Sequence, residues 1–160
     1  MAYHDDLLRQ AHQLAHSERT RPKQASLRRS VSTAYYALFH LLIAESVANW
    51  RKANHRPELA RAFDHSTMKA ASNRIQDRKQ FPFEGVDSGV VNALKFVAKT
   101  FVVLQENRQL ADYDNSTFWS KTEALSLIRS AERAFAGWQS IRDEPIAQQY
   151  LLSLLVKRRA

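Results

Sequence analysis

One long apolar segment constrains the fold of this chain more than any other feature. Between residues 22 and 50, apolar side chains recur at steps of three and four residues, which is the period of a buried helix face. They are Leu27, Val31, Ala34, Tyr35, Leu38, Leu41 and Leu42. Pro22 suits the first helical turn, because its missing N–H is unpaired there anyway. The segment is apolar over most of its girth near Phe39, so we expect it to be the central helix of a bundle.

Further segments with helical periodicity lie on both sides of this one. We predict helices at about 3–16, at 64–79, at 87–108, from 120 and from 143, with a short turn at 58–63. Asp64 and Asp87 are predicted N-caps, and Ser120 with Glu123 is a capping-box signature. Residues 111–116 read as a turn, because their Asp, Asn and Ser side chains compete for backbone hydrogen bonds.

The number of residues and the scarcity of turn formers decide the fold class. The chain has 160 residues, 3 Gly and 4 Pro, which suits one domain and argues against a fold with many tight turns. No strand pattern or internal repeat is visible. The prediction is a single all-α domain over residues 1–160. It is an up-and-down bundle of four to five main helices plus a short C-terminal helix.

Several classes of site and location are disfavoured by composition. Cysteine is absent, so thiolate chemistry and disulfides are excluded. No Gly-rich phosphate loop or Rossmann fingerprint occurs, so we expect no cofactor. His12 and His16 have metal-ligand spacing, but no acidic third ligand is evident, and two surface histidines are the commoner cause, so we expect no metal site. A polar N-terminus and an apolar run of only 31–44 predict a cytoplasmic protein with no membrane partner.

The charge is unevenly distributed along the chain. The formal net charge is +8, and residues 1–80 hold 14 of the 24 lysines and arginines but only 7 of the 16 acidic residues. A basic half beside a nearly neutral half favours a polyanionic partner such as RNA, or an acidic protein. The alternative is simply a basic, solvated surface.

The first candidate site lies at the end of the helix predicted at 87–108. Arg108 is followed by Asp112, Tyr113 and Asp114. Arginine there can bind a phosphate bidentately, or it can pair with one of the carboxylates. The structural alternative is a helix C-terminus with a favourable cation and a turn behind it.

The second candidate site is the series Arg61, His65 and Lys69, spaced by four residues. Such residues could share one helical face. Histidine beside cations can cleave RNA without a metal, because it can take the 2′-hydroxyl proton while the cations stabilise the charged phosphorane. The face can also break, since Asp64 and His65 straddle the predicted helix start, and a solvated basic face is the alternative.

Taken together, these segments resemble the HEPN family of prokaryotic helical-bundle proteins. Residues 28–40, with Tyr35-Tyr36-Ala37-Leu38-Phe39-His40, look like a family signature. Arg108-x-x-Ala-Asp112-Tyr113 is similar to the element that follows two helices later. Residues 63–69 resemble the His-containing helix start between the two elements, and Ala131, Glu132 and Phe135 match a further element. The resemblance covers about residues 25–138.

The resemblance implies a homodimeric bundle whose sites lie near the dimer groove. Many HEPN proteins are metal-independent endoribonucleases of toxin–antitoxin or defence systems, and others partner small nucleotidyltransferases. Their nuclease motif is Arg, four to six residues, then His. Here Arg108 carries over but Tyr113 stands where that His would be, and tyrosine is a poor base at neutral pH.

Three functions therefore stay open on the sequence alone. The chain could be an RNA-directed protein in which Arg108 and Arg61 bind phosphate, His65 is base or acid, and Lys69 supports it electrostatically. Asp112 would then be an orienting residue, and Tyr113 would donate its hydroxyl. It could be a non-catalytic partner of an antitoxin or a nucleotidyltransferase. It could be a nucleotide-binding regulatory domain in which Tyr35, Tyr36 and Tyr113 clamp a base, although aromatics on a central helix are usually core.

Overall fold

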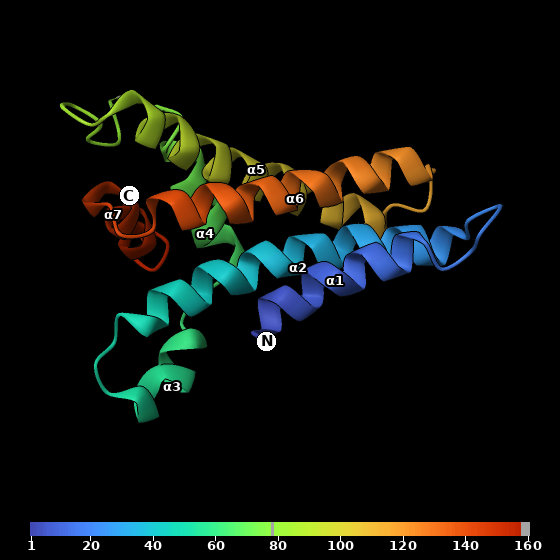
Figure 1. The fold of residues 1–160 in the computed structure, drawn as a ribbon, viewed down its shortest axis with the longest axis horizontal. Helices are drawn as coiled ribbons and strands as arrows, with labels where there is room; N and C mark the ends of the chain where they lie inside the picture. The colour runs from blue at the N-terminus through green and yellow to red at the C-terminus, as the bar shows by residue number, and fades with distance from the viewer. Residues whose placement is uncertain (78, 158–160) are drawn as a thin grey trace.

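Four long helices run alternately in opposite directions and form the body of the molecule (Figure 1). The computed structural model describes residues 1–77 and 79–157, and within these residues every regular element is helical. The helices are α1 (Tyr3–Ala15), α2 (Gln24–Ala48), α3 (Arg56–Ala60), α4 (His65–Arg74), α5 (Ser88–Tyr113), α6 (Lys121–Ile141) and α7 (Pro145–Ser153). The long helices are α1, α2, α5 and α6. The predicted all-α bundle is confirmed.

Helix α2 is the central element of this bundle, as its periodicity predicts. It packs against α1, α5 and α6, and Tyr35, Leu38 and Leu42 on it are fully buried. By length and hydropathy alone, α2 could also cross a membrane, but 61% of its 18-residue apolar window is buried inside the bundle. That window is longer than the apolar run 31–44, and its burial is typical of a core helix.

Side-chain caps fix where three helices begin, all at predicted positions. The Asp64 carboxylate accepts the backbone N–H of Thr67 at 2.8 Å and begins α4. Asp87 accepts the N–H groups of Gly89 and Val90 and begins α5. Ser120 begins α6 by accepting the N–H of Glu123 at 3.0 Å. Each cap satisfies donors that the first turn of a helix leaves unpaired.

Helix α5 ends at Tyr113 rather than near Arg108, so the turn predicted at 111–116 is partly helical. Arg28 on α2 donates to the carbonyls of Ala111 at 3.0 Å, Asp114 at 2.8 Å and Thr117. These hydrogen bonds satisfy acceptors that a helix end exposes, and they anchor the following loop. A contact from another helix therefore outweighs the local turn preference of this segment.

Three other predicted boundaries are wrong. Helix α2 begins after Lys23, so Pro22 precedes the helix, and Arg21 adopts a positive φ of 53° just before it. Helix α2 ends at Ala48, which leaves Trp50 in the connection, and α4 ends at Arg74.

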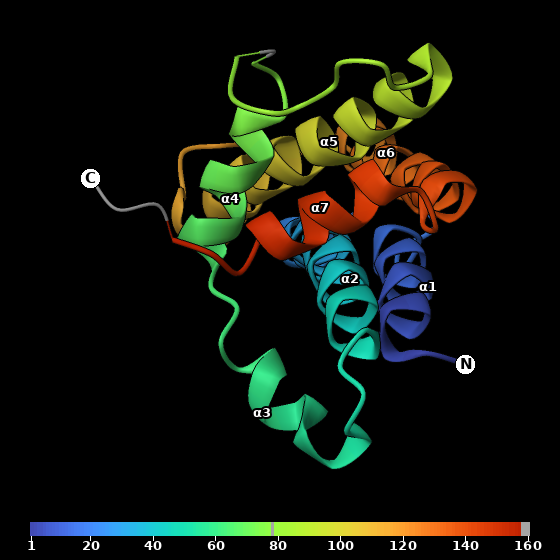
Figure 2. The same cartoon turned by 90° about the vertical axis from the view of Figure 1, so that its left-hand side faces the viewer.

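The segment after α2 leaves the body of the bundle. A 3₁₀ turn at Ala53–His55 leads into the short helix α3, and Figure 2 shows both standing away from the long helices. Arg56 donates to the carbonyls of Trp50 at 2.9 Å and Ala48 at 3.2 Å, which closes this lobe onto the end of α2. We call residues 50–62 the α3 lobe.

Candidate functional site

Arg108 lies in the bundle interior against two aromatic rings of α2. Its residue exposure is 8%, and its guanidinium carbon lies 5.3 Å from the Tyr35 ring centroid and 5.7 Å from that of Tyr36. Both rings are within the range of a cation–π interaction. The two tyrosines are adjacent on α2, and α5 packs directly on this helix, which brings Arg108 to them.

Asp112 pairs with Arg108 one helical turn further along α5. The distance from Arg108 Nη1 to Asp112 Oδ2 is 3.7 Å, and Ser32 on α2 donates its hydroxyl to the same carboxylate oxygen at 3.3 Å. Of the two carboxylates that could pair with Arg108, the structure pairs Asp112 with it. At 3.7 Å the contact is longer than a hydrogen bond, so the pair is loose.

His65 is brought to the same place by the hydroxyl of Tyr35. The distance from Tyr35 Oη to His65 Nδ1 is 2.6 Å, and the imidazole stacks on Phe39 with ring centroids 4.5 Å apart. Tyr35 and Phe39 are four residues apart and therefore share one face of α2. One face of the central helix thus holds both Arg108 and His65, which are 43 positions apart in the chain.

The electrostatic surroundings keep the His65 imidazole neutral. Burial lowers the pKa of His65, and the nearby Arg108 cation lowers it further, while the Asp64 carboxylate acts in the opposite direction. Burial also lowers the pKa of His40, with His4 and His65 adding to the effect. Burial raises the pKa of Tyr35, against the opposing influence of Arg108. At neutral pH the site therefore holds a neutral imidazole, a phenol and a guanidinium.

Two buried polar atoms of α5 have no hydrogen-bond partner among the described residues. They are Arg108 Nε and Gln105 Oε1, and Gln105 is only 3% exposed. Buried polar atoms are nearly always paired, so these two atoms can accept or donate a hydrogen bond to water or to another group that enters the site. A third such atom, Trp119 Nε1, belongs to a separate small cluster of buried residues.

The other predicted site residues lie around this cluster or away from it. Lys69 is one turn after His65 on α4 and pairs with Glu106 of α5 at 3.5 Å. Arg61 is exposed and caps the end of α3. Of the two alternatives for Arg61, His65 and Lys69, the helical face therefore breaks at the start of α4. Tyr113 is 76% exposed and is therefore not packed into the cluster.

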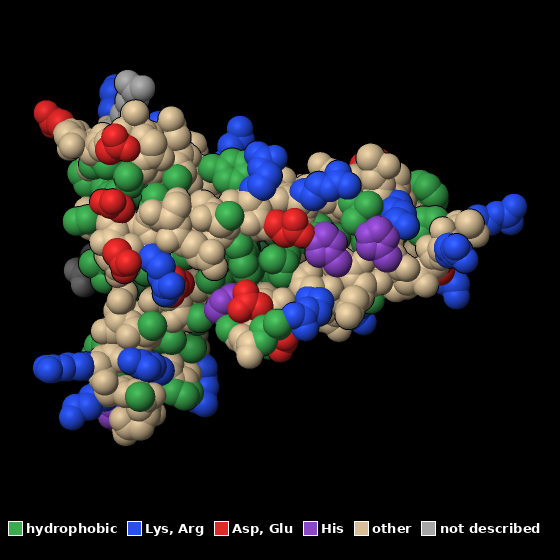
Figure 3. All heavy atoms as spheres, in the orientation of Figure 1, with side chains coloured by type: hydrophobic (Ala, Val, Ile, Leu, Met, Phe, Trp, Pro, Cys, Tyr) green, Lys and Arg blue, Asp and Glu red, His purple; other side chains and the backbone are tan. Residues whose placement is uncertain are grey.

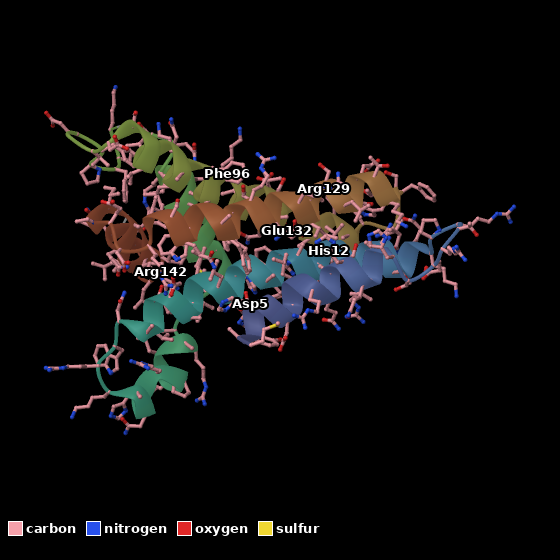
Figure 4. All side chains as sticks on the ribbon, in the orientation of Figure 1. Asp5, His12, Phe96, Arg129, Glu132 and Arg142 are labelled. Atoms are coloured by element: carbon pink, nitrogen blue, oxygen red, sulfur yellow. The ribbon has the colours of Figure 1, made fainter. Side chains whose placement is uncertain are left out.

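No metal centre is found in the part of the chain that the structure describes. The ring of His12 contacts the Glu132 carboxylate instead, and Figure 4 shows the two side chains facing each other from α1 and α6. Glu132 was not foreseen as a neighbour because it lies 120 positions away. The contact ties α1 to α6.

Sequence reasoning missed the residues that assemble the cluster. The Tyr35 hydroxyl, Ser32 and Phe39 all lie on α2 and hold groups from α4 and α5. Arg28 is the first residue of the segment 28–40 that resembles a family signature, and nothing in its spacing predicts that it fixes the end of α5. The spacing of Ser32, Tyr36 and His40 by four residues was the available signal for a polar stripe on an otherwise apolar helix.

Comparisons of this chain with models of protein families, with curated proteins and with solved structures gave no match. Its chemistry must therefore be inferred from the cluster itself. A half-buried neutral imidazole can accept a proton, and a buried guanidinium beside it can bind an anion. We refer below to Arg108, His65, Tyr35, Tyr36 and Asp112 as the α2–α5 cluster.

Proposed function

We propose that this protein acts on RNA as a metal-independent endoribonuclease through the α2–α5 cluster. The observation that carries the proposal is the position of Tyr35. Its hydroxyl holds His65 at 2.6 Å, and its ring lies 5.3 Å from the Arg108 guanidinium. One side chain thereby contacts both the imidazole that we propose moves the proton and the guanidinium that we propose binds the phosphate. The resemblance to HEPN proteins and the basic N-terminal half support the same function.

Arg108 is suited to bind the scissile phosphate. Its Nε has no hydrogen-bond partner within residues 1–77 and 79–157, and its Nη1 contact with Asp112 is loose at 3.7 Å. A phosphate oxygen can replace that contact with shorter, charge-assisted hydrogen bonds. Tyr36 is half-buried beside the Arg108 guanidinium, so its ring can support an unpaired base, which is how proteins commonly read single-stranded RNA.

His65 is suited to take the proton of the attacking 2′-hydroxyl. As that proton moves to the imidazole, the 2′-oxygen forms a bond to phosphorus, and the bond from phosphorus to the 5′-oxygen breaks. The products are a 2′,3′-cyclic phosphate and a 5′-hydroxyl, whose oxygen takes a proton from water or from the imidazolium. Arg108 stabilises the negative charge that builds up on the phosphorane oxygens.

The hydroxyl of Tyr35 suits His65 in either protonation state. A hydroxyl can both donate and accept a hydrogen bond, so it can accept from Nδ1–H or donate to an unprotonated Nδ1. In the first case Nε2 is free to take the proton. Because burial and Arg108 lower the pKa of His65, the basic form is already present at pH 7. Cleavage should therefore rise with pH only below about 6.5 and then level off.

The test is cleavage of single-stranded RNA by the purified protein in EDTA. We expect a 2′,3′-cyclic phosphate product from the wild type and a loss of about 100-fold or more in His65→Asn, because general-base catalysis contributes that much. Arg108→Gln should lose a comparable factor. His16→Asn and Arg129→Gln change exposed residues of the same types and should cleave normally.

Two results would count against this function. Equal cleavage by wild type and His65→Asn would show that a contaminating nuclease or another base is responsible. No cleavage by any form, with helicity confirmed by circular dichroism, would exclude an endoribonuclease acting on that RNA. RNA binding that depends on Arg108 would then leave the cluster as a phosphate-binding site without catalysis.

A further inference from the structure

An apolar groove lies at the end of the molecule away from the Arg28 contacts, where α2, α3 and α7 meet. It holds a cavity of about 230 Å³. Its apolar lining residues are Trp50, Leu59, Phe63, Leu151, Leu152 and Leu155. Drug-sized ligands occupy pockets of roughly 300–1,000 Å³. The cavity is therefore better matched to one or two anchoring side chains of a larger partner.

The groove is flanked by unusually exposed apolar side chains. Trp50 is 51% exposed, Leu152 64% and Val156 52%. The other two tryptophans of the chain, Trp119 and Trp138, are buried. A second, shallow hollow shares Trp50 and Leu59 with the groove, so the apolar surface continues onto the α3 lobe. Apolar patches rimmed by polar residues commonly mark protein interaction sites.

The rim of this groove is basic on one side and uncharged on the other. Residues 50–62 carry four cations, namely Arg51, Lys52, Arg56 and Arg61, and a single carboxylate, Glu58. Residues 145–156 carry no charged side chain. In Figure 3 the Lys and Arg side chains project from the α3 lobe next to hydrophobic ones. The lobe therefore combines an apolar floor with a positive edge.

We propose that this groove binds an acidic amphipathic helix of a partner protein. Apolar residues at positions i, i+3, i+4 and i+7 of the partner enter the groove beside Trp50 and Leu152, and its acidic residues face Arg51 and Lys52. Helices bind hydrophobic grooves in this way, and the positive edge selects an acidic partner. The groove shares no residue with the α2–α5 cluster, so the inference stands independently of RNA cleavage.

Trp50 provides the readout. As the exposed tryptophan, it dominates any change in fluorescence when the groove is covered. The probe is a peptide of about 15 residues with Leu at the four anchor positions and Glu elsewhere, and its control carries Lys in place of Glu. We expect the acidic peptide to bind saturably, with a blue shift of the Trp50 emission. The basic peptide should produce no shift.

Two pairs of variants localise the binding. Leu152→Glu should weaken binding of the acidic peptide by about tenfold or more, as replacement of a central anchor residue does. Phe118→Glu changes an apolar residue that is even more exposed, 77% accessible in the α5–α6 loop, and this variant should bind the peptide normally. Reversing the charge of Arg51 and Lys52 together should weaken binding, whereas reversing Lys99 and Arg129 should not.

Three results would overturn the inference. Equal binding of the acidic and basic peptides would remove the charge selection. Equal binding by Leu152→Glu and Phe118→Glu would place the peptide elsewhere. A wild-type dimer that becomes monomeric in Leu152→Glu but not in Phe118→Glu, measured by analytical ultracentrifugation, would show that a second copy covers the groove.

Discussion

Replacing Tyr35 with phenylalanine removes one oxygen from the centre of the α2–α5 cluster. The ring stays in place, because it is fully buried and lies near Phe101 with centroids 5.5 Å apart. The lost interaction is the 2.6 Å hydrogen bond to His65 Nδ1. A hydrogen bond contributes about 0.5–1.5 kcal/mol net. His65 is half-buried, so water partly replaces the partner, and we expect a loss of about 1 kcal/mol.

Urea unfolding followed by circular dichroism measures this loss, and in a domain of this size it corresponds to a fall in Tm of about 2–4 °C. Tyr150→Phe is the matched control. Its hydroxyl bonds Ser72 at 2.7 Å with both residues fully buried, so that variant should lose about 1–2 kcal/mol.

The histidine resonances distinguish the two variants. Tyr35→Phe should shift the NMR titration of His65 and slow RNA cleavage, because the imidazole loses its orientation. Tyr150→Phe should change neither, since its partner Ser72 lies about two turns further along α4 and does not contact the His65 imidazole. A Tyr35→Phe protein with unchanged stability and an unchanged His65 titration would refute the hydrogen bond and the positioning of the base that depends on it.

Three further changes test the supports of the site. Arg28→Ala should cost about 2–3 kcal/mol, because hydrogen bonds from a charged donor to part-buried carbonyls contribute that much. Replacing the exposed Arg29 with Ala should cost less than about 0.5 kcal/mol, and urea unfolding at pH 7 measures both losses. Asp64→Ala should cost about 1 kcal/mol through loss of the N-cap. The Thr67 N–H lowers the pKa of Asp64 to about 2, so this contribution is present above the unfolded value and disappears as pH falls towards 2. The pKa values of His65 and His40 are lower in the folded protein than in the unfolded chain. Below about pH 6.5 the unfolded chain therefore binds more protons than the folded protein. The free energy of unfolding should then fall as the pH is lowered from about 7.5 to 5.

Each of these expectations has a contrary result. Equal losses of stability in Arg28→Ala and Arg29→Ala would show that the three hydrogen bonds from Arg28 to carbonyls contribute nothing specific. A stability difference between wild type and Asp64→Ala that persists unchanged at pH 2 would contradict the ionised cap. If His65→Gln and His40→Gln retain the full wild-type pH dependence, other histidines are responsible for it.

The fold was predictable where local chemistry decides the structure. Asp64, Asp87 and Ser120 begin helices as expected, because a cap acts on N–H groups only two or three residues away. The apolar stripe of α2 identified the central helix for the same reason, since its three- and four-residue spacing can be read from a short stretch of sequence. These features depend on short sequence separations and need no knowledge of the tertiary structure.

Long-range contacts decide the features that sequence reasoning missed. Helix α5 continues to Tyr113 because Arg28, more than 80 positions earlier, satisfies its last carbonyls. Tyr35 was regarded as a core residue or a nucleotide clamp. It is buried like a core residue, yet its hydroxyl bonds His65 in another helix.

The candidate site was likewise predictable where local spacing decides it and not where tertiary packing does. Arg108, Asp112 and Lys69 could be chosen from spacing and charge, and the meeting of His65 with Arg108 could be stated only as a possibility. Their proximity depends on how α4 and α5 pack on α2, which periodicity does not specify. Arg61 is not on the same helix as His65 and Lys69, because the four-residue spacing spans a break between α3 and α4.

Backbone amides of the α3 lobe should exchange hydrogen with solvent faster than those in the middle of α2. The amides in the middle of α2 are surrounded by α1, α5 and α6, so they can exchange with solvent only when the whole domain unfolds. Helix α3 has 5 residues and none of them is buried, so its amides should exchange through local opening. Covering the lobe with a partner helix would then slow exchange at residues 50–62 while leaving the slowest amides of α2 unchanged.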